Sequence, residues 1–248
     1  MTITRRGRLT ITITVAAIVV VAVAWLVGTN TSTSQQGAAP PPTPTASTIR
    51  ASPSPLPTEP TPTPTQPPEP TPIPTEGSGT LSSVPGTDEA DGSGDTLRYQ
   101  VEVEDGLPVE PAEFASAVHE TLTDDRGWQS VEDVAFERTT TDTEFSVILA
   151  SPDTTDEMCE PLDTGGELSC RVGEHVVLNA KRWAEGVSHF DGRLGMYRQY
   201  LVNHEVGHAL GHDHVDCPAP GEPAPVMMQQ TKSIGDCEPN AWPTVSAY

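Results

Sequence analysis

The chain has 248 residues, with 13 Lys and Arg against 35 Asp and Glu, and a formal net charge of −22 at pH 7. A chain with this much negative charge repels nucleic acid and anionic lipid headgroups. We therefore expect no nucleic-acid partner. Composition divides it into three parts: residues 1–28 are basic and then apolar, residues 29–95 are rich in Pro, Thr, Ser and Gly, and residues 96–248 have a globular composition. The last part is long enough for one domain with one core.

The N-terminal part predicts export. Three arginines precede an apolar run over residues 9–28, which is long enough to span a bilayer as a helix and carries no charge. The arginines predict a cytoplasmic N-terminus, with the rest of the chain outside. The length of the run favours an uncleaved transmembrane anchor in the plasma membrane, although Ala22-Val23-Ala24 could be the cleavage site of a signal peptide. The globular part is therefore expected at the cell surface, or secreted if cleavage occurs.

Residues 29–95 predict a disordered stalk. Proline recurs from Pro40 to Pro74, interleaved with Thr, and Gly77 to Asp95 continues as a Gly, Ser and acidic stretch. Such a composition cannot form a core and favours extended polyproline II, which would reach on the order of 110 Å for the proline-rich part. A stalk of this length could hold a domain away from a membrane through a cell wall, which makes wall material a candidate partner.

The globular part opens with a strand and a helix. Apolar and polar residues alternate over 97–103, which predicts a strand. Pro111 is typical of the first turn of a helix, and Phe114, Val118 and Leu122 follow at helical spacing on one face. We therefore expect this helix to pack its apolar face on a sheet.

Further strands follow in the middle of the domain. Residues 134–136 and 144–150 are apolar enough for strands, and the second, the most apolar, is expected at the centre of the sheet. Residues 168–171 and 175–179 flank a turn and predict a hairpin. Strands, one helix, more strands and then a long helix predict an α/β (α+β) fold, in which helices pack on a twisted mixed sheet.

The long helix is expected over residues 192–209, with Asp191 as its N-cap. Its apolar residues cover most sides, which is typical of a buried helix. A buried helix holds its side chains firmly, as a metal site requires.

The end of this helix carries the pattern H-E-x-x-H-x-x-G-x-x-H. His204 and His208 are four residues apart, so both imidazoles project from one face. Glu205 is placed to act as general base on a water that the metal activates. Gly211 can adopt the left-handed conformation that ends a helix, which lets His214 return as a third ligand. Three imidazoles with an open fourth position are typical of catalytic zinc; solvent-facing histidines or a structural zinc site are the alternatives.

The remaining histidines are given no part in the site. By helical phase His212 points away from the ligand pair, so we expect it at the surface or behind the ligands. His119, His175 and His189 are interpreted as structural.

The four cysteines of an exported domain predict two disulfides. Three pairings are possible. We favour Cys159–Cys170 and Cys217–Cys237, because each closes a short local loop.

The pattern resembles the metzincin clan of zinc endopeptidases. The two marks of that clan are the extended helix motif, here His204–His214, and a methionine turn, here Pro225–Met228. The resemblance implies that one methionine forms an apolar floor beneath the metal without binding it. We assign this role to Met227, with Met228 as the alternative.

The globular part as a whole resembles an uncharacterised family of secreted bacterial metzincin-like domains. The similar segments are residues 101–106, the loop 159–170, residues 176–179 and residues 227–232. This resemblance implies a fold and a metal site, but no substrate. Gln229 departs from the clan, since some metzincins carry a tyrosine at that position.

These observations predict a zinc metallopeptidase that acts as a monomer on a protein or peptide substrate. Zn²⁺ would be held by the three histidines, and Glu205 would take a proton from water and pass it to the leaving amine. The substrate would add as a strand beside an edge strand, for which residues 165–171 are the candidate. The alternatives are a non-proteolytic zinc hydrolase, such as an amidase on cell-wall peptides, and an inactive zinc-stabilised domain that binds a partner.

Overall fold

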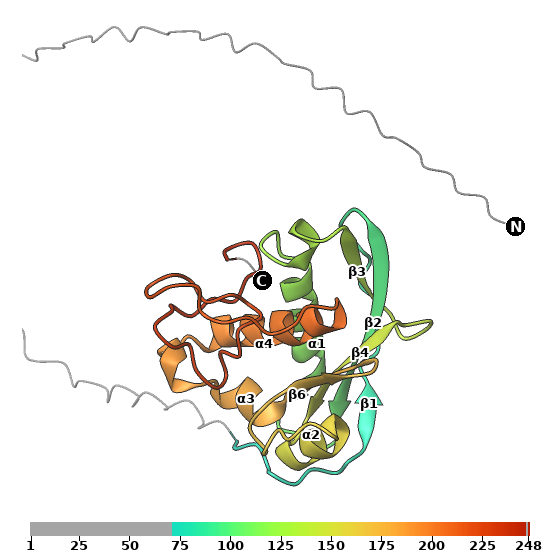
Figure 1. Cartoon of the computed structure of the whole chain (residues 1–248). Helices are drawn as coiled ribbons and strands as arrows, with labels where there is room; N and C mark the ends of the chain where they lie inside the picture. Colours follow the sequence, from blue (N-terminus) through green and yellow to red (C-terminus); the bar gives the residue numbers. More distant parts are fainter. Residues whose placement is uncertain (1–70, 247) are drawn as a thin grey trace, which may run out of the picture. The chain divides into compact units, whose positions relative to one another are not determined.

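The computed structural model describes residues 71–246 and residue 248 (Figure 1). The expected membrane anchor at 1–28 and the proline-rich stalk up to residue 70 lie outside these residues. In the part of the chain that is described, no helix has the length and apolar character needed to cross a membrane.

The core of the domain is a mixed sheet of six strands within the described residues. The strand order is β1-β2-β4-β6-β5, and β3 pairs with β2 in addition. β2, β3, β4 and β6 pair in parallel, whereas β1 and β5 are antiparallel edge strands. The strands are β1 (Leu81–Ser83), β2 (Asp95–Glu104), β3 (Val134–Arg138), β4 (Phe145–Ala150), β5 (Cys170–Val172) and β6 (His175–Asn179).

Strand β4 lies at the centre of the sheet, as its apolar sequence predicted. All six of its residues are buried. Because side chains alternate along a strand, Val147 and Leu149 join the main core, whereas Ile148 and Ala150 join a smaller cluster on the other face. Both faces of the sheet are therefore covered.

Four α-helices within the described residues cover these faces. Helices α1 and α4 lie on one side of the sheet and pack on each other (Figure 1), whereas α2 packs against β5 and β6. The helices are α1 (Pro111–Leu122), α2 (Pro152–Cys159), α3 (Ala180–Glu185) and α4 (Leu194–Ala209). The predicted α1 is confirmed with Phe114, Val118 and Leu122 buried, while α2 and α3 were not predicted.

Helix α4 begins two residues later than the sequence predicted. Asp191 has a φ of 50° and Gly192 a φ of +72°, both left-handed and therefore incompatible with a helix start at residue 192. The N-cap position is occupied by Arg193, which makes no side-chain capping hydrogen bond. The prediction of Asp191 as N-cap is wrong because this residue instead closes the short 3₁₀ turn Ser188–Phe190.

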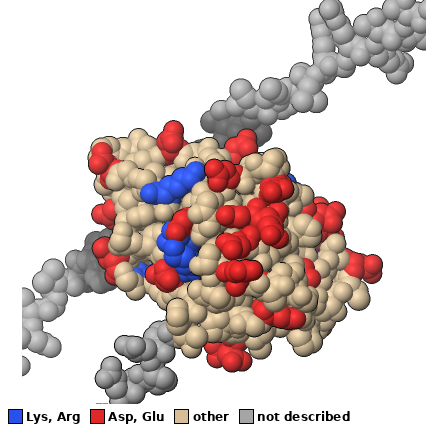
Figure 2. Space-filling model, turned by 90° about the horizontal axis from the view of Figure 1, so that it is seen from below, with Lys and Arg blue, Asp and Glu red and all other residues tan. Residues whose placement is uncertain are grey.

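Both predicted disulfides are present. Cys159–Cys170 and Cys217–Cys237 have Cα–Cα separations of 6.0 and 5.8 Å. The first joins the end of α2 to β5. The second closes a loop, without helix or strand, that contains Met227. Acidic side chains are spread over the face shown in Figure 2, on which Lys and Arg are few.

Part of the segment predicted to be a disordered stalk lies in the folded domain. Strand β1 pairs with β2 through Leu81 and Glu104, and Asp88 forms backbone hydrogen bonds and an ion pair with Arg138. The boundary at residue 96 is therefore too late. The sequence did not reveal this because β1 has three residues, of which only Leu81 is apolar.

The carboxylate of Glu104 holds this N-terminal segment on the sheet. Its side chain is 1% exposed and accepts hydrogen bonds from Gly79 N (2.7 Å), Ser151 N (2.6 Å) and Thr154 Oγ1 (2.8 Å). Burial alone would raise the pKa of Glu104, but these hydrogen bonds outweigh it and lower the pKa. The carboxylate is therefore stabilised in its charged form.

Replacement of Glu104 should lower stability in a pH-dependent way. Glu104→Gln is expected to reduce the free energy of unfolding at neutral pH by about 1–3 kcal/mol, because an amide NH₂ would face backbone donors. Since the pKa of Glu104 is below its ordinary value of 4.5 when folded, its contribution is complete above that pH and is lost as the pH falls below it.

Denaturant unfolding at about pH 7 and about pH 3 measures this difference. Glu102→Gln, on the same strand but half-buried, is the matched control and should have little effect. An equal loss in both variants, or a difference that does not shrink in acid, would contradict the role of Glu104.

Candidate metal centre

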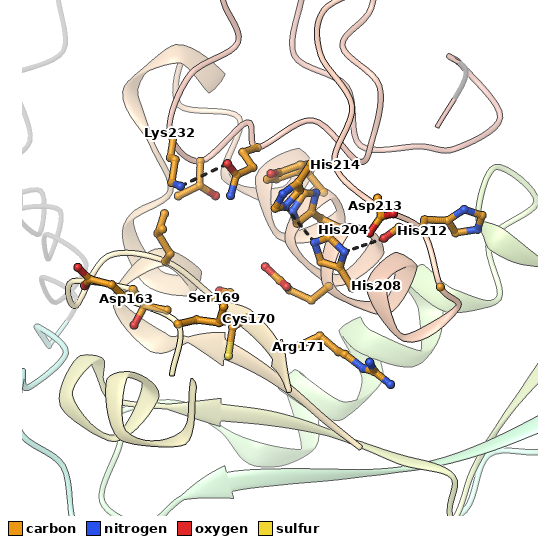
Figure 3. A pocket seen from close by; sticks show the side chains of 18 residues that line it. Asp163, Ser169, Cys170, Arg171, His204, His208, His212, Asp213, His214 and Lys232 are labelled. Atoms are coloured by element: carbon orange, nitrogen blue, oxygen red, sulfur yellow. Dashed lines mark hydrogen bonds between the residues drawn. The ribbon is translucent and has the colours of Figure 1, made fainter. Parts of the chain in front are cut away.

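Three histidines converge at the end of α4. One ring nitrogen from each of His204, His208 and His214 can be chosen so that all lie within 4.8 Å of one another. Figure 3 shows the three rings turned toward one another. His204 is buried at the base of the cluster, His208 is half-buried and His214 is exposed. The cluster is therefore open to solvent on one side.

The third histidine reaches the cluster because the chain reverses after α4. Gly211 has a φ of +99°, and its N–H donates to His208 O (3.2 Å). The N–H of His212 donates to Gly207 O (3.0 Å), which completes the hydrogen-bond pair of a Schellman motif. A residue with a Cβ would be strained at this φ, so the glycine of the motif is required by the turn.

Backbone carbonyls orient the first two imidazoles. His204 Nδ1 lies 2.8 Å from Val226 O, and His208 Nδ1 lies 2.8 Å from His212 O. A carbonyl only accepts, so each Nδ1 carries the proton and each Nε2 presents its lone pair. Nε2 of His208 is 3.0 Å from Nε2 of His214, close to the roughly 3.3 Å expected between two nitrogens on one tetrahedral zinc.

The imidazoles are neutral in this environment. Burial lowers the pKa of His204 to about 3, with a smaller opposing effect from the hydrogen bond to Val226 O. Burial also lowers the pKa of His208 and of His214. A metal ligand must be deprotonated, so these environments suit coordination.

Glu205 lies beside the cluster in the wall of the same pocket. Its side chain is 4% exposed, and no hydrogen bond to its carboxylate is formed within the described residues. Burial raises the pKa of Glu205 to about 8. A cation held by the three histidines would lower this pKa and favour the carboxylate form. Because no described residue hydrogen-bonds its oxygens, they are available to a small molecule bound at the cluster.

The methionine loop packs beneath the helix that carries the ligands. Met227 is fully buried, and its sulfur contacts the backbone of Gly207, between the two helical ligands. Met228 is half-buried, and its carbonyl accepts a hydrogen bond from Tyr200 Oη (3.1 Å). Met227, rather than Met228, therefore packs against the turn of α4 between His204 and His208.

The cluster lies in a pocket of about 540 Å³. One wall is α4 with the segment up to His214, and the opposite wall is formed by residues 162–164 and 168–171 (Figure 3). Gln229, Thr231 and Lys232 close a third side. The edge strand predicted at 165–171 is mostly wrong: β5 covers Cys170–Val172, so only Cys170 and Arg171 of the predicted range belong to it, and residues 165–167 form a turn.

The sequence did not place Tyr200 or Lys232 in the pocket, and it gave Arg171 only as part of the candidate edge strand 165–171. Tyr200 is one turn before His204 on α4, and its ring centroid is 5.3 Å from that of His204, so helical spacing could have revealed it. Arg171 and Lys232 reach the pocket from distant segments. No local pattern marks them, because their proximity depends on the packing of β5 and the methionine loop against α4.

His212 supports the cluster from outside it. Its ring stacks on Trp128, with centroids 4.7 Å apart and planes at 9°, and Nε2 is 3.1 Å from Glu132 Oε1. Figure 3 shows the ring pointing away from His208. His212 lies outside the three-histidine cluster, as expected, but not because of helical phase, since α4 ends at Ala209. It contacts His208 through its backbone carbonyl.

The other three histidines lie outside the cluster. His119 Nδ1 is 3.0 Å from Tyr99 Oη, and His189 hydrogen-bonds Gln230 O. His175 is exposed at the start of β6. None of them lines the pocket.

Fold and site together define a disulfide-bonded α+β domain with a candidate metal centre of three imidazoles. The chain belongs to the family described as "Protein of unknown function (DUF3152)", whose model matches residues 67–244. The match begins before residue 96, in agreement with the ordered segment around β1. A search of curated proteins found no match, and neither did a search of solved structures.

Residue 207 must be a glycine because Trp128 and Met227 pack against this position beneath the histidine cluster. A Cβ there would lie 2.6 Å from Trp128 Cζ2 and would overlap the Met227 sulfur. The indole cannot easily shift, because its Nε1 donates to Asn203 O (2.8 Å). Gly207→Ala should therefore cost about 1–3 kcal/mol of stability despite the better helix propensity of alanine.

Thermal unfolding of the two glycine variants of α4 tests this packing. At Gly195, on the same helix, a Cβ meets nothing within 4 Å, so Gly195→Ala should be neutral or stabilise by up to about 1 kcal/mol. If Gly207→Ala is as stable as Gly195→Ala, Met227 and Trp128 do not form a rigid floor.

Proposed function

We propose that this protein is an extracellular zinc-dependent endopeptidase with a metzincin-like site. The observation that carries the proposal is the convergence of His204, His208 and His214 beside the free carboxylate of Glu205, in a pocket faced by an edge strand. The turn at Gly211 and the buried Met227 agree with the two marks of the metzincin clan.

The donor set fits Zn²⁺. The three donors are neutral imidazole nitrogens, two of them oriented through Nδ1 by backbone carbonyls, which is the usual environment of zinc ligands. No fourth side chain belongs to the cluster among the described residues, so one position would be left for water or substrate. At such a site Zn²⁺ supplies a Lewis acid that polarises a carbonyl and acidifies a water.

Glu205 provides the proton transfer in this mechanism. One carboxylate oxygen accepts a proton from the attacking water as the water oxygen bonds to the scissile carbonyl carbon. Glu205 then donates this proton to the leaving nitrogen as the C–N bond breaks, which regenerates the carboxylate. The carboxylate can serve both steps because no described residue hydrogen-bonds it.

Strand β5 provides a place for an extended peptide. β6 pairs with one edge of β5, and residues 168–171 line the pocket opposite the histidines. A peptide that adds to the free edge would form backbone hydrogen bonds along its length, as in strand addition. Its scissile bond would then lie between β5 and the cluster. An endopeptidase needs to bind the backbone of its substrate in this way, because the hydrogen bonds do not depend on the substrate's side chains.

The two disulfides support an extracellular location. Disulfides persist in oxidising compartments and are rare in the cytosol. The strong acidic charge is consistent with a soluble exported domain.

Replacement of Glu205 should separate catalysis from metal binding. Full-length Glu205→Gln is expected to keep its zinc but to lose roughly 10²–10⁴-fold in kcat on a random peptide library, because the amide cannot take up the proton. Product analysis by mass spectrometry and metal analysis of the same sample measure both quantities. A chelator should abolish cleavage by the wild type, and zinc should restore it.

Glu113→Gln, an exposed change on α1, is the control and should cleave like the wild type. Tightly bound zinc without turnover of any peptide would refute the endopeptidase. Turnover of cell-wall fragments alone would favour the amidase alternative, and no turnover on either substrate would favour an inactive binding domain.

A further inference from the structure

Basic residues in the described part of the chain are nearly all paired. Nine of the 13 Lys and Arg lie there, and six of these form ion pairs with a carboxylate. Arg198 instead donates to Trp183 O (2.7 Å) and lies over the Trp183 ring. Arg171 and Lys232 are the two that remain. In a chain with so many acidic residues, two cations without a carboxylate partner are unexpected.

Both of these cations line the pocket that contains the histidine cluster. Arg171 lies on β5, and the consecutive residues Ser169, Cys170 and Arg171 all line the pocket. Lys232 follows the methionine loop, and its Nζ donates one hydrogen bond to Gln229 Oε1 (3.3 Å). Figure 3 shows the two residues on different sides of the pocket.

The two cations reach the pocket from different walls. Arg171 belongs to the wall formed by residues 168–171, and Lys232 belongs to the side formed with Gln229 and Thr231. Both residues are exposed, and the Arg171 side chain forms no hydrogen bond within the described residues. A ligand at the cluster would therefore meet a positive group on each of two walls.

The carboxylates that line the pocket form no ion pair with these cations. Asp163, Glu205 and Asp213 line it, but none lies within ion-pair distance of Arg171 or Lys232. Repulsion by the acidic surface is screened over roughly 8 Å at physiological ionic strength, whereas a contact in the pocket is screened much less. Attraction between a substrate and the two cations of the pocket can therefore determine which substrate binds, although the chain as a whole is negatively charged.

We propose that Arg171 and Lys232 select peptides that carry acidic side chains next to the scissile bond. Arg171 offers a planar donor pair that matches a carboxylate, and Lys232 offers a compact charge on a flexible stem. This inference rests on the proposed peptidase function and adds its substrate class, an acidic peptide.

The test uses the full chain loaded with zinc and an octapeptide library in which each position in turn is Glu, Gln, Lys or Leu. The wild type should cleave Glu peptides at least about tenfold faster, in kcat/KM, than their Gln counterparts, the value expected for a charge-assisted contact. In Arg171→Gln/Lys232→Gln this ratio should fall toward one. The ratio compares two substrates of the same variant, so it does not depend on how much protein is active.

Two further variants separate charge from folding. Arg171→Lys/Lys232→Arg should keep the preference for Glu, and Arg98→Gln, on β2 outside the pocket, should not change it. A wild-type ratio near one, or a preference that survives loss of both cations, would overturn the inference while leaving the peptidase function intact.

A binding measurement keeps the inference testable if no peptide is cleaved. Fluorescence anisotropy of full-length Glu205→Gln with a labelled Glu-rich octapeptide and its Gln counterpart reports affinity without turnover. Tighter binding of the Glu peptide, lost in the variant without both cations, supports the acidic-ligand pocket even though the peptidase function would fail. Equal affinities would overturn it.

Discussion

The candidate metal centre depends on the reversal of the chain at the end of α4. Gly211 adopts a φ of +99°, and the two hydrogen bonds of the turn bring His214 back toward the helix. The same turn places the carbonyl of His212 within hydrogen-bond distance of His208 Nδ1. One turn therefore both positions His214 and orients the imidazole of His208. Without this reversal, α4 would present only two of the three ligands.

Support from behind α4 comes from an irregular segment rather than from the sheet. Val226 O orients His204, and Met227 packs on Gly207. The loop that carries both contains no helix or strand and is closed by Cys217–Cys237, which in the chain-entropy model contributes roughly 3 kcal/mol. The disulfide thus constrains the residues that hold the ligands, although none of its atoms lies in the pocket.

The cluster itself could be predicted from the sequence because its residues are close in the chain and follow helical spacing. The central strand β4 and the disulfides were also found, from a run of apolar residues and from local loop closure. The ordered segment around β1 was missed, since it depends on the distant carboxylate of Glu104. Arg171 lies in the segment predicted as the substrate's edge strand, but its place in the pocket opposite Lys232 was not predicted, because only tertiary packing brings β5 and the methionine loop to α4.

The proposed function requires His204, His208 and His214 to hold one zinc ion with an open fourth position. X-ray absorption at the zinc K-edge, on the full chain loaded with one equivalent of zinc, measures this coordination. Three imidazoles and one water should give a four-coordinate shell of nitrogen and oxygen at about 2.0 Å with the scattering of three imidazoles. A shell with sulfur at about 2.3 Å, or a spectrum that His208→Ala leaves unchanged, would contradict it.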